Sequence, residues 1–180
     1  MKQVHSSRLP RRPFSAIIPT LFAAALLLAA CNEPAKTALP LELPDGAACA
    51  LDGMILGDFP GPKAQIHYDR GEPDFFCDTR EMFSLVLRPE QQKRIVAIYT
   101  QDMAKADWEH PDGHWLDARS AFYVVGSPRR GSMGPTVPGF ASAADAARYA
   151  EQHGGKVLPF AEVTLEMVDL SGGVSHDERM

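Results

Sequence analysis

The sequence is poor in cysteine and tryptophan and has no apolar run long enough to cross a membrane as a helix. It contains three Cys and two Trp in 180 residues, and its unbroken apolar run from Leu21 to Ala30 is preceded by Pro19. A membrane-spanning helix needs about 20 apolar residues, which excludes this run as a span. Beyond residue 30, basic residues are also scarce: 14 Lys and Arg stand against 23 Asp and Glu, a net charge of −9. This acidity argues against a sequence-independent nucleic-acid binder, and the length excludes a large multidomain enzyme.

The first thirty residues have the composition of an export signal. They contain four basic residues and no acidic residue, and they continue into the apolar stretch Phe14–Ala30, which ends in small residues. A basic segment followed by a short apolar segment is the layout of a secretory signal peptide. We therefore expect residues 1–30 to form a signal peptide.

The residue that follows this segment is a cysteine in a characteristic context. Leu28-Ala29-Ala30-Cys31 resembles the lipobox of bacterial lipoproteins, in which the cysteine is lipidated on its sulfur and becomes the mature N-terminus. Each buried methylene of an acyl chain contributes about 0.8 kcal/mol, so several chains together anchor a protein firmly. The alternative is a plain signal peptide followed by an accidental cysteine. Asn32 is not the aspartate that favours inner-membrane retention in some bacteria, which leaves the choice of membrane open.

Lipidation of Cys31 leaves Cys49 and Cys77 as the remaining thiols. Two cysteines outside the cytosol form a disulfide by default. The alternative is a site for a soft metal ion, which thiolates bind well.

Prolines and turn residues predict how the mature chain is divided. Residues 31–47 contain three prolines and no periodicity, which is typical of a flexible tether. A folded domain is expected over 48–168, in halves of about 48–105 and 106–168. Residues 169–180 are expected to form a polar tail.

The first half is predicted to contain strands around one helix. A short strand is expected near 53–57, and the alternation in 64–68 followed by the segment 73–77 predicts a hairpin. Thr79 is expected to cap a helix whose apolar residues recur at helical spacing. Residues 94–103 are expected to form a core strand.

The second half repeats this order. Strands are predicted at 114–118 and 120–127, then a loop at 128–139, a helix that Ser142 caps and Gly154 ends, and a strand over 156–167. Each half therefore follows the order strand, strand, helix, strand, and the predicted fold class is α+β with two small ββαβ units. A unit of about fifty residues buries only a thin core, so we expect the two units to pack together.

Four stretches in this order, behind a lipobox, resemble the NosL family, whose members are lipoproteins that accompany nitrous oxide reductase as copper chaperones. They are Cys49-x4-Met54, residues 61–67 (GPKAQIH), residues 75–83 (FFCDTREMF), and residues 123–127 (YVVGS) with 131–135 (GSMGP). The resemblance covers residues 49–165. It implies treble-clef-like ββαβ units of the kind seen in organomercurial lyase, in agreement with the two halves. The chain departs from many relatives at Asp52, where they carry a second cysteine or another polar residue.

The sulfur-containing residues suit Cu(I), which prefers thiolate and thioether ligands and accepts low coordination numbers. Cys49 and Met54 are five residues apart, so a turn can bring both sulfurs to one ion. Met133 lies on a glycine-flanked loop where no period explains a buried apolar residue. Core packing is the commoner role of methionine and stays the alternative for both. Met82 and Met103 fall in predicted core positions, and we interpret them as packing residues.

Further candidate ligands carry less specific signals. Cys77 is a second sulfur ligand, a buried apolar residue or a disulfide partner, and Asp78 could orient a ligand as an outer acceptor. His67 is a third ligand, a site for a harder metal, or a half-exposed strand histidine. His110 and His114 have metal-like spacing, but the Pro-Asp-Gly turn between them prevents one-face helical geometry, so we assign them to a loop with zinc as an outlying alternative.

The resemblance implies a periplasm-facing, membrane-anchored protein that binds Cu(I) and delivers it to the tetranuclear copper–sulfide centre of nitrous oxide reductase. Transfer by ligand exchange needs an open position, which two or three soft ligands leave, and an acidic surface supports docking. We expect no enzymatic activity. Two rival interpretations remain: an organomercurial-lyase-like enzyme that uses Cys49, Cys77 and Asp78, and a structural lipoprotein with a Cys49–Cys77 disulfide. No Ser/His/Asp or other nucleophile-and-base motif is visible in the sequence.

Overall fold

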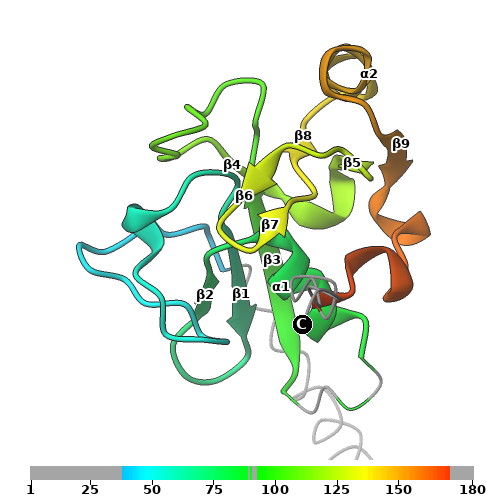
Figure 1. The fold of residues 1–180 in the computed structure, drawn as a ribbon. Helices are drawn as coiled ribbons and strands as arrows, with labels where there is room; N and C mark the ends of the chain where they lie inside the picture. Colours follow the sequence, from blue (N-terminus) through cyan, green and yellow to red (C-terminus); the bar gives the residue numbers. More distant parts are fainter. Residues whose placement is uncertain (1–37, 89, 91–92, 171–180) are drawn as a thin grey trace, which may run out of the picture. The chain divides into compact units, whose positions relative to one another are not determined.

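The computed structural model describes residues 38–88, 90 and 93–170 (Figure 1). The predicted signal peptide, Cys31, the first part of the predicted tether and nearly all of the predicted tail lie outside the described residues. Within the described part of the chain, no helix has the length and apolar character that a membrane span requires.

The first ββαβ unit is built around strand β1 (Ala64–Tyr68). β1 pairs antiparallel with β2 (Asp74–Phe76) on one side and with β3 (Ile95–Gln101) on the other, and helix α1 (Thr79–Val86) connects β2 to β3. β4 (Trp115–Asp117) adds to the outer edge of β3, which gives the strand order β2-β1-β3-β4 (Figure 1). The predicted hairpin and the predicted core strand are confirmed.

The second ββαβ unit repeats this arrangement around β5 (Phe122–Val125). β5 lies between β8 (Gly139–Phe140) and β9 (Lys156–Pro159), both antiparallel to it, and helix α2 (Ala143–His153) connects them. In the chain, a short hairpin of β6 (Arg130–Gly131) and β7 (Gly134–Pro135) follows β5 and precedes β8. The predicted α+β fold with two ββαβ units is therefore confirmed.

Three predicted strands differ from the observed ones. Residues 115–117 pair with β3 and so belong to the first sheet, whereas the second strand of the second unit is β8, inside the predicted loop. A strand of two residues shows no periodicity, so β8 could not be predicted from the sequence. The predicted strand over 156–167 ends at Pro159, because 3₁₀ turns follow at Phe160–Glu162 and Glu166–Val168. Near 53–57 only a single bridge between Ala48 and Ile55 forms.

The helix caps follow local chemistry in one case and tertiary contacts in the other. Ser142 Oγ accepts the Asp145 amide at 3.1 Å, and α2 ends at Gly154 with a φ of 75°, as predicted. For α1 the cap is Asp78, whose carboxylate accepts the Arg80 amide at 2.9 Å. The predicted cap, Thr79, donates instead to the Val137 carbonyl at 2.6 Å, because a buried hydroxyl needs a partner.

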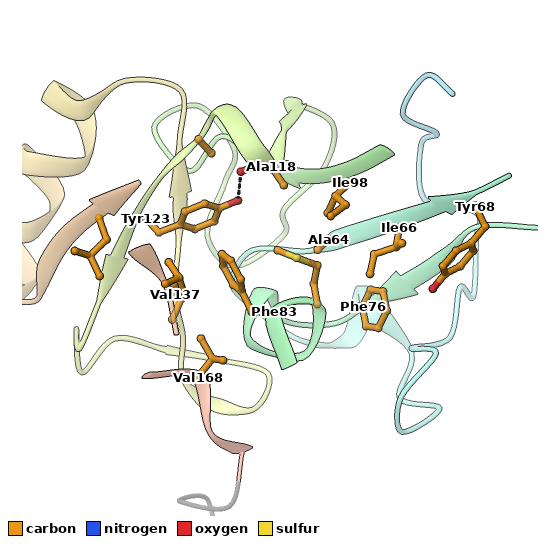
Figure 2. Close-up of a cluster of buried hydrophobic side chains, with 14 residues drawn as sticks. Ala64, Ile66, Tyr68, Phe76, Phe83, Ile98, Ala118, Tyr123, Val137 and Val168 are labelled. Carbon is orange, nitrogen blue, oxygen red and sulfur yellow. Dashed lines mark hydrogen bonds between the residues drawn. The ribbon is translucent and has the colours of Figure 1, made fainter. Parts of the chain in front are cut away.

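The two units share one hydrophobic core (Figure 2). Phe83 of α1 packs edge-on against Tyr123 of β5 with ring centroids 4.8 Å apart. Tyr123 is wholly buried and donates to the Ala118 carbonyl at 2.8 Å, so its hydroxyl is satisfied. Ala64, Ile66 and other core residues come from the first unit, and Leu158 comes from β9. Each thin unit thereby completes the core of the other.

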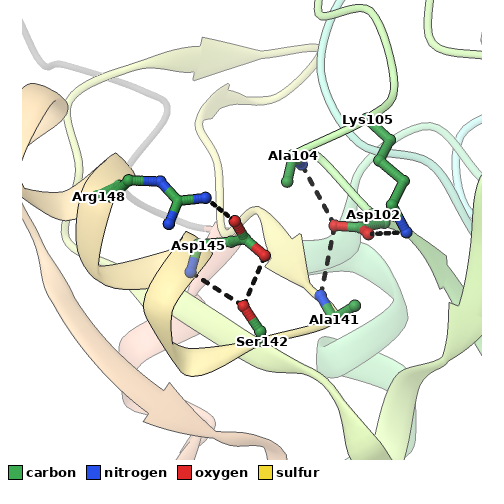
Figure 3. Close-up of polar contacts among 7 residues, drawn as sticks. All are labelled: Asp102, Ala104, Lys105, Ala141, Ser142, Asp145 and Arg148. Carbon is green, nitrogen blue, oxygen red and sulfur yellow. Dashed lines mark hydrogen bonds and ion pairs between the residues drawn. The ribbon is translucent and has the colours of Figure 1, made fainter.

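A buried carboxylate also joins the end of β3 to the start of α2 (Figure 3). Asp102 accepts the amides of Ala104 and Ala141, each at 3.3 Å, and pairs with Lys105 at 3.1 Å. Next to it, the Met103 amide donates to the Gly139 carbonyl at 2.9 Å. The two sheets are therefore connected through the backbone as well as through the core.

Candidate metal centre

Cys49 lies on a tight backbone turn that ends at Met54. The Cys49 amide donates to the Met54 carbonyl at 2.8 Å, and the Gly53 amide donates to the Cys49 carbonyl at 2.9 Å. Gly53 adopts a φ of 78°, and Asp52 accepts the Met54 amide at 2.9 Å. The sequence predicts a turn between Cys49 and Met54, and the structure forms one.

Cys77 lies between β2 and α1, and its side chain is wholly buried. The turn that carries Cys49 is fixed to the same strand, because the Ala50 amide donates to the Phe75 carbonyl at 2.8 Å. This contact brings the two cysteines together. Both are free thiols in the structure.

A glutamate carboxylate lies between the two sulfurs. The Cys49 thiol donates to Glu81 Oε2 at 3.0 Å and the Cys77 thiol donates to the same oxygen at 3.3 Å. With the exposed Asp52, these residues offer four ligand atoms within 4.8 Å of one another. Glu81 Oε1 is buried and has no hydrogen-bond partner among the described residues. A buried oxygen without a partner is costly, and a bound cation would remove that cost.

Two methionines surround the cysteines. Met54 and Met133 are half-buried and pack against the cluster of Cys49, Leu56 and Cys77. Met133 reaches it on the β6–β7 hairpin, which is held in place by the Ser132 hydroxyl donating to the Cys77 carbonyl at 2.8 Å. The structure therefore gathers the four predicted sulfur residues in one cluster.

Cys49, Cys77 and Glu81 are in contact with one another, and each has a shifted pKa. The hydrogen bond from Cys77 lowers the pKa of Cys49 to about 5, against the opposing effect of burial. The same contact, together with burial, raises the pKa of Cys77. Burial first, and then the Cys49 sulfur, raise the pKa of Glu81 to about 8. Cys49 is therefore the more acidic of the two thiols.

His67 is not brought to this cluster. Its Nε2 lies 2.7 Å from Gln65 Oε1, and its ring packs edge-on against Tyr99 with centroids 5.6 Å apart. The Gln65 amide also binds the backbone of Leu41 through two hydrogen bonds of 2.9 Å. His67 thus belongs to a contact between β1 and the chain that leads into the domain, and its role as a ligand stays an untested prediction from the sequence.

Glu81 is the residue that sequence reasoning missed. Asp78 and Glu81 stand three residues apart at a helix start, which is the capping-box pattern and predicts a structural role for Glu81. The informative signal was the spacing of four residues between Cys77 and Glu81 across that helix start. Asp78, which the sequence suggested as an outer acceptor, instead caps α1 and accepts the Thr136 hydroxyl at 2.7 Å. Burial raises the pKa of Asp78 to about 6.

Comparison with known proteins shows the family to which this chain belongs. The NosL family model matches residues 40–168. The chain is 39% identical over 146 residues to "Copper-binding lipoprotein NosL" of Stutzerimonas stutzeri, covering 81% of this chain and 76% of the relative. It is 43% identical over 155 residues to the protein of the same name from Achromobacter cycloclastes, covering 82% and 80%. The crystal structure of the copper chaperone NosL from Shewanella denitrificans matches with a TM-score of 0.67 at 36% identity, covering 71% of this chain and 97% of that chain. The chain belongs to the NosL family.

Proposed function

We propose that this chain is a membrane-anchored copper chaperone that binds one Cu(I) ion and delivers it to nitrous oxide reductase for assembly of its copper–sulfide centre. The convergence of two free cysteines on one buried carboxylate, with two methionines packed around them, carries this proposal. The names of the relatives as copper-binding lipoproteins and of the similar structure as a copper chaperone support it.

The residue types fit a soft ion that must later be released. Cys49 and Cys77 supply thiolates, and Met54 and Met133 supply thioethers, which bind more weakly and can exchange. The turn that carries Cys49 exposes Leu51 and Ile55, which are 49% and 38% exposed to solvent. An acceptor protein can therefore approach the metal centre from this side and take the ion by ligand exchange.

Competition for Cu(I) against a chromogenic chelator under anaerobic conditions tests the binding. We expect one tightly bound Cu(I) per chain and a loss of affinity of about 100-fold or more in Cys49→Ser, since even an outer-shell change costs roughly 10- to 100-fold. Met133→Leu should lose less, and Met167→Leu, at an exposed position outside the cluster, is the matched control. Unchanged affinity in Cys49→Ser would reject Cys49 as a ligand.

Delivery to the reductase is tested by the copper content of nitrous oxide reductase purified from cells that lack this chain. We expect that content to fall, because assembly of the copper–sulfide centre would lose its copper source. Full copper occupancy without the chain would overturn this part of the proposal.

The anchor is part of the same proposal. We infer that residues 1–30 direct export, that Cys31 carries the lipid, and that residues 31–47 connect it to the domain on the periplasmic side. The last part of this connection contacts the domain, since Tyr99 donates to the Ala38 carbonyl at 2.6 Å and Gln65 binds Leu41. Intact-mass measurement of the mature chain tests the lipid.

A carboxylate between two free cysteines also favours a second candidate function, that of an organomercurial-lyase-like enzyme. The sequence suggested Asp78 as the acid of an organomercurial-lyase-like site, whereas Glu81 is the carboxylate that accepts hydrogen bonds from both thiols. Cleavage of an organomercurial substrate, lost in Glu81→Gln, would favour the enzyme. Copper binding without such cleavage, and two free thiols in anaerobically purified protein, would favour the chaperone over both the enzyme and the disulfide-bonded lipoprotein.

A further inference from the structure

Lys63 is a buried cation next to the candidate metal centre. Its side chain is wholly buried at the start of β1, and its backbone is fixed by the Gln101 side chain, which accepts the Lys63 amide at 3.0 Å. Burying an ammonium group costs several kcal/mol unless hydrogen bonds and opposite charges compensate. A lysine at this position therefore suggests a functional role that offsets the cost of its burial.

The hydrogen bonds of Lys63 fit its charged form. Nζ donates to the carbonyls of Phe59 at 2.8 Å, Pro60 at 3.2 Å and Cys77 at 3.2 Å. An ammonium group has three donors, whereas a neutral amine has two. Each of the three donors thus has one acceptor, and one of these acceptors belongs to a cysteine of the site.

The charges around Lys63 come from the same site. Burial lowers the pKa of Lys63, and negative charge on Cys77, Asp78, Glu81 and Cys49 acts in the opposite direction. Asp78 Oδ1 accepts the Arg80 amide and the Thr136 hydroxyl, whereas its buried Oδ2 has no hydrogen-bond partner among the described residues. The charge of Lys63 is therefore coupled to the sulfur cluster as well as to Asp78.

We propose that Lys63 is a specificity-determining residue of the metal centre, whose buried ammonium makes the two-thiolate site select a monovalent soft ion over a divalent one. This inference rests on the proposed function. A monovalent ion on two thiolates forms a group of net charge −1, which the ammonium group of Lys63 attracts. A divalent ion on the same thiolates forms a neutral group, which gains no such attraction, so Lys63 favours the monovalent ion over the divalent one.

Lys63 has a second, purely mechanical contact that must be separated from its charge. The Cys77 carbonyl accepts hydrogen bonds from both Lys63 and Ser132, at 3.2 and 2.8 Å. Loss of either donor could shift Cys77 and weaken the binding of every metal ion alike. Loss of the charge, in contrast, should lower the affinity for Cu(I) relative to the affinity for a divalent ion.

The test measures the affinities of the full chain for Cu(I) and Cd(II) and compares their ratio among variants. We expect Lys63→Met and Lys63→Gln to lower the ratio of Cu(I) to Cd(II) affinity by roughly 10- to 100-fold, the range of outer-shell effects on metal sites. Lys63→Gln keeps a hydrogen-bond donor without the charge. Ser132→Ala removes the other donor to the Cys77 carbonyl and is the matched control, with an unchanged ratio.

The outcomes separate this inference from the proposed function. Wild-type protein that binds Cu(I), with an unchanged ratio in both Lys63 variants, overturns the inference and leaves the chaperone proposal intact. Equal loss of both ions in Lys63→Met and Ser132→Ala also overturns it, because a mechanical role then suffices. If neither Lys63 variant folds, Lys63 is a fold-stabilising residue and the inference fails. Wild-type protein that binds no Cu(I) overturns the proposed function itself.

Discussion

Three ionisable side chains around the two cysteines are wholly buried: Lys63, Asp78 and Glu81. Buried charged groups are normally paired or hydrogen-bonded, since they lose the solvation of water. Lys63 has three carbonyl acceptors. Asp78 Oδ1 accepts an amide and a hydroxyl, and its Oδ2 has no partner among the described residues. Glu81 has only the two thiols, and its second oxygen has no partner among the described residues. A metal ion bound by the two cysteines would therefore change the surroundings of Glu81, because Glu81 contacts both sulfurs.

His67 provides a prediction at the scale of one residue. Burial lowers its pKa below the ordinary value of 6.5. The folded protein then binds fewer protons than the unfolded chain, so the free energy of unfolding should fall as the pH falls below about 6.5. We expect His67→Gln to lack this part of the pH dependence in denaturant titrations between pH 5 and pH 8.

The same variant tests the placement of His67 outside the metal cluster. At pH 7 its Cu(I) affinity should equal that of the wild-type protein, because His67 binds Gln65 rather than the sulfur residues. A clear loss of affinity would return His67 to the set of ligands.

Among the elements, the β6–β7 hairpin depends on a close approach between two glycines. A Cβ atom on Gly61, whose φ is 83°, would lie 2.8 Å from Gly131 Cα. A Cβ atom on Gly131 would lie 2.7 Å from Asp78 Oδ2 and 3.1 Å from Thr136 Cβ. The loop before β1, the cap of α1 and the hairpin therefore meet without space for a side chain, and this contact positions Met133.

We expect Gly131→Ala to lower the free energy of unfolding by about 1–3 kcal/mol, the usual cost of overpacking. Its Cu(I) affinity should also fall, because Ser132 and Met133 lie on the displaced hairpin. Gly57→Ala is the control, since a Cβ atom there meets nothing within 4 Å. Thermal unfolding and chelator competition measure the two effects. Equal behaviour of the two variants would show that the close approach is unimportant.

At the scale of the whole molecule, the candidate metal centre contains residues of both ββαβ units. Cys77 and Glu81 come from the first unit, whereas Met133 lies between β5 and β8 of the second. The two units also share one core, so neither presents a complete site alone. One ion held by parts of both units would suit the copper-chaperone function proposed above.

The proposed anchor gives a prediction for the whole chain. The mature protein should begin at Cys31 and exceed the mass of residues 31–180 by the mass of its acyl chains. Cys31→Ser should lack this added mass, because the sulfur that accepts lipid is gone, and Cys49→Ser should keep it as the matched control. Intact mass spectrometry makes the measurement. A mature wild-type chain without acyl mass would contradict lipid anchoring.

The sequence by itself determined those elements whose signals are local. The alternation of 64–68 predicted β1, and Ser142 and Gly154 predicted both ends of α2, because periodicity and capping act within a few residues. The sequence also pointed to Cys49, Met54, Cys77 and Met133, since soft ligands are recognisable by type.

Only the tertiary structure decided which residues meet. Glu81 reaches Cys49 across 32 residues, and Ser132 reaches the Cys77 carbonyl across 55. The same long-range pairing assigned β4 to the first sheet and placed His67 with Gln65, away from the sulfur atoms. Such contacts depend on how two sheets pack around a common core, and no local pattern in the chain encodes that packing.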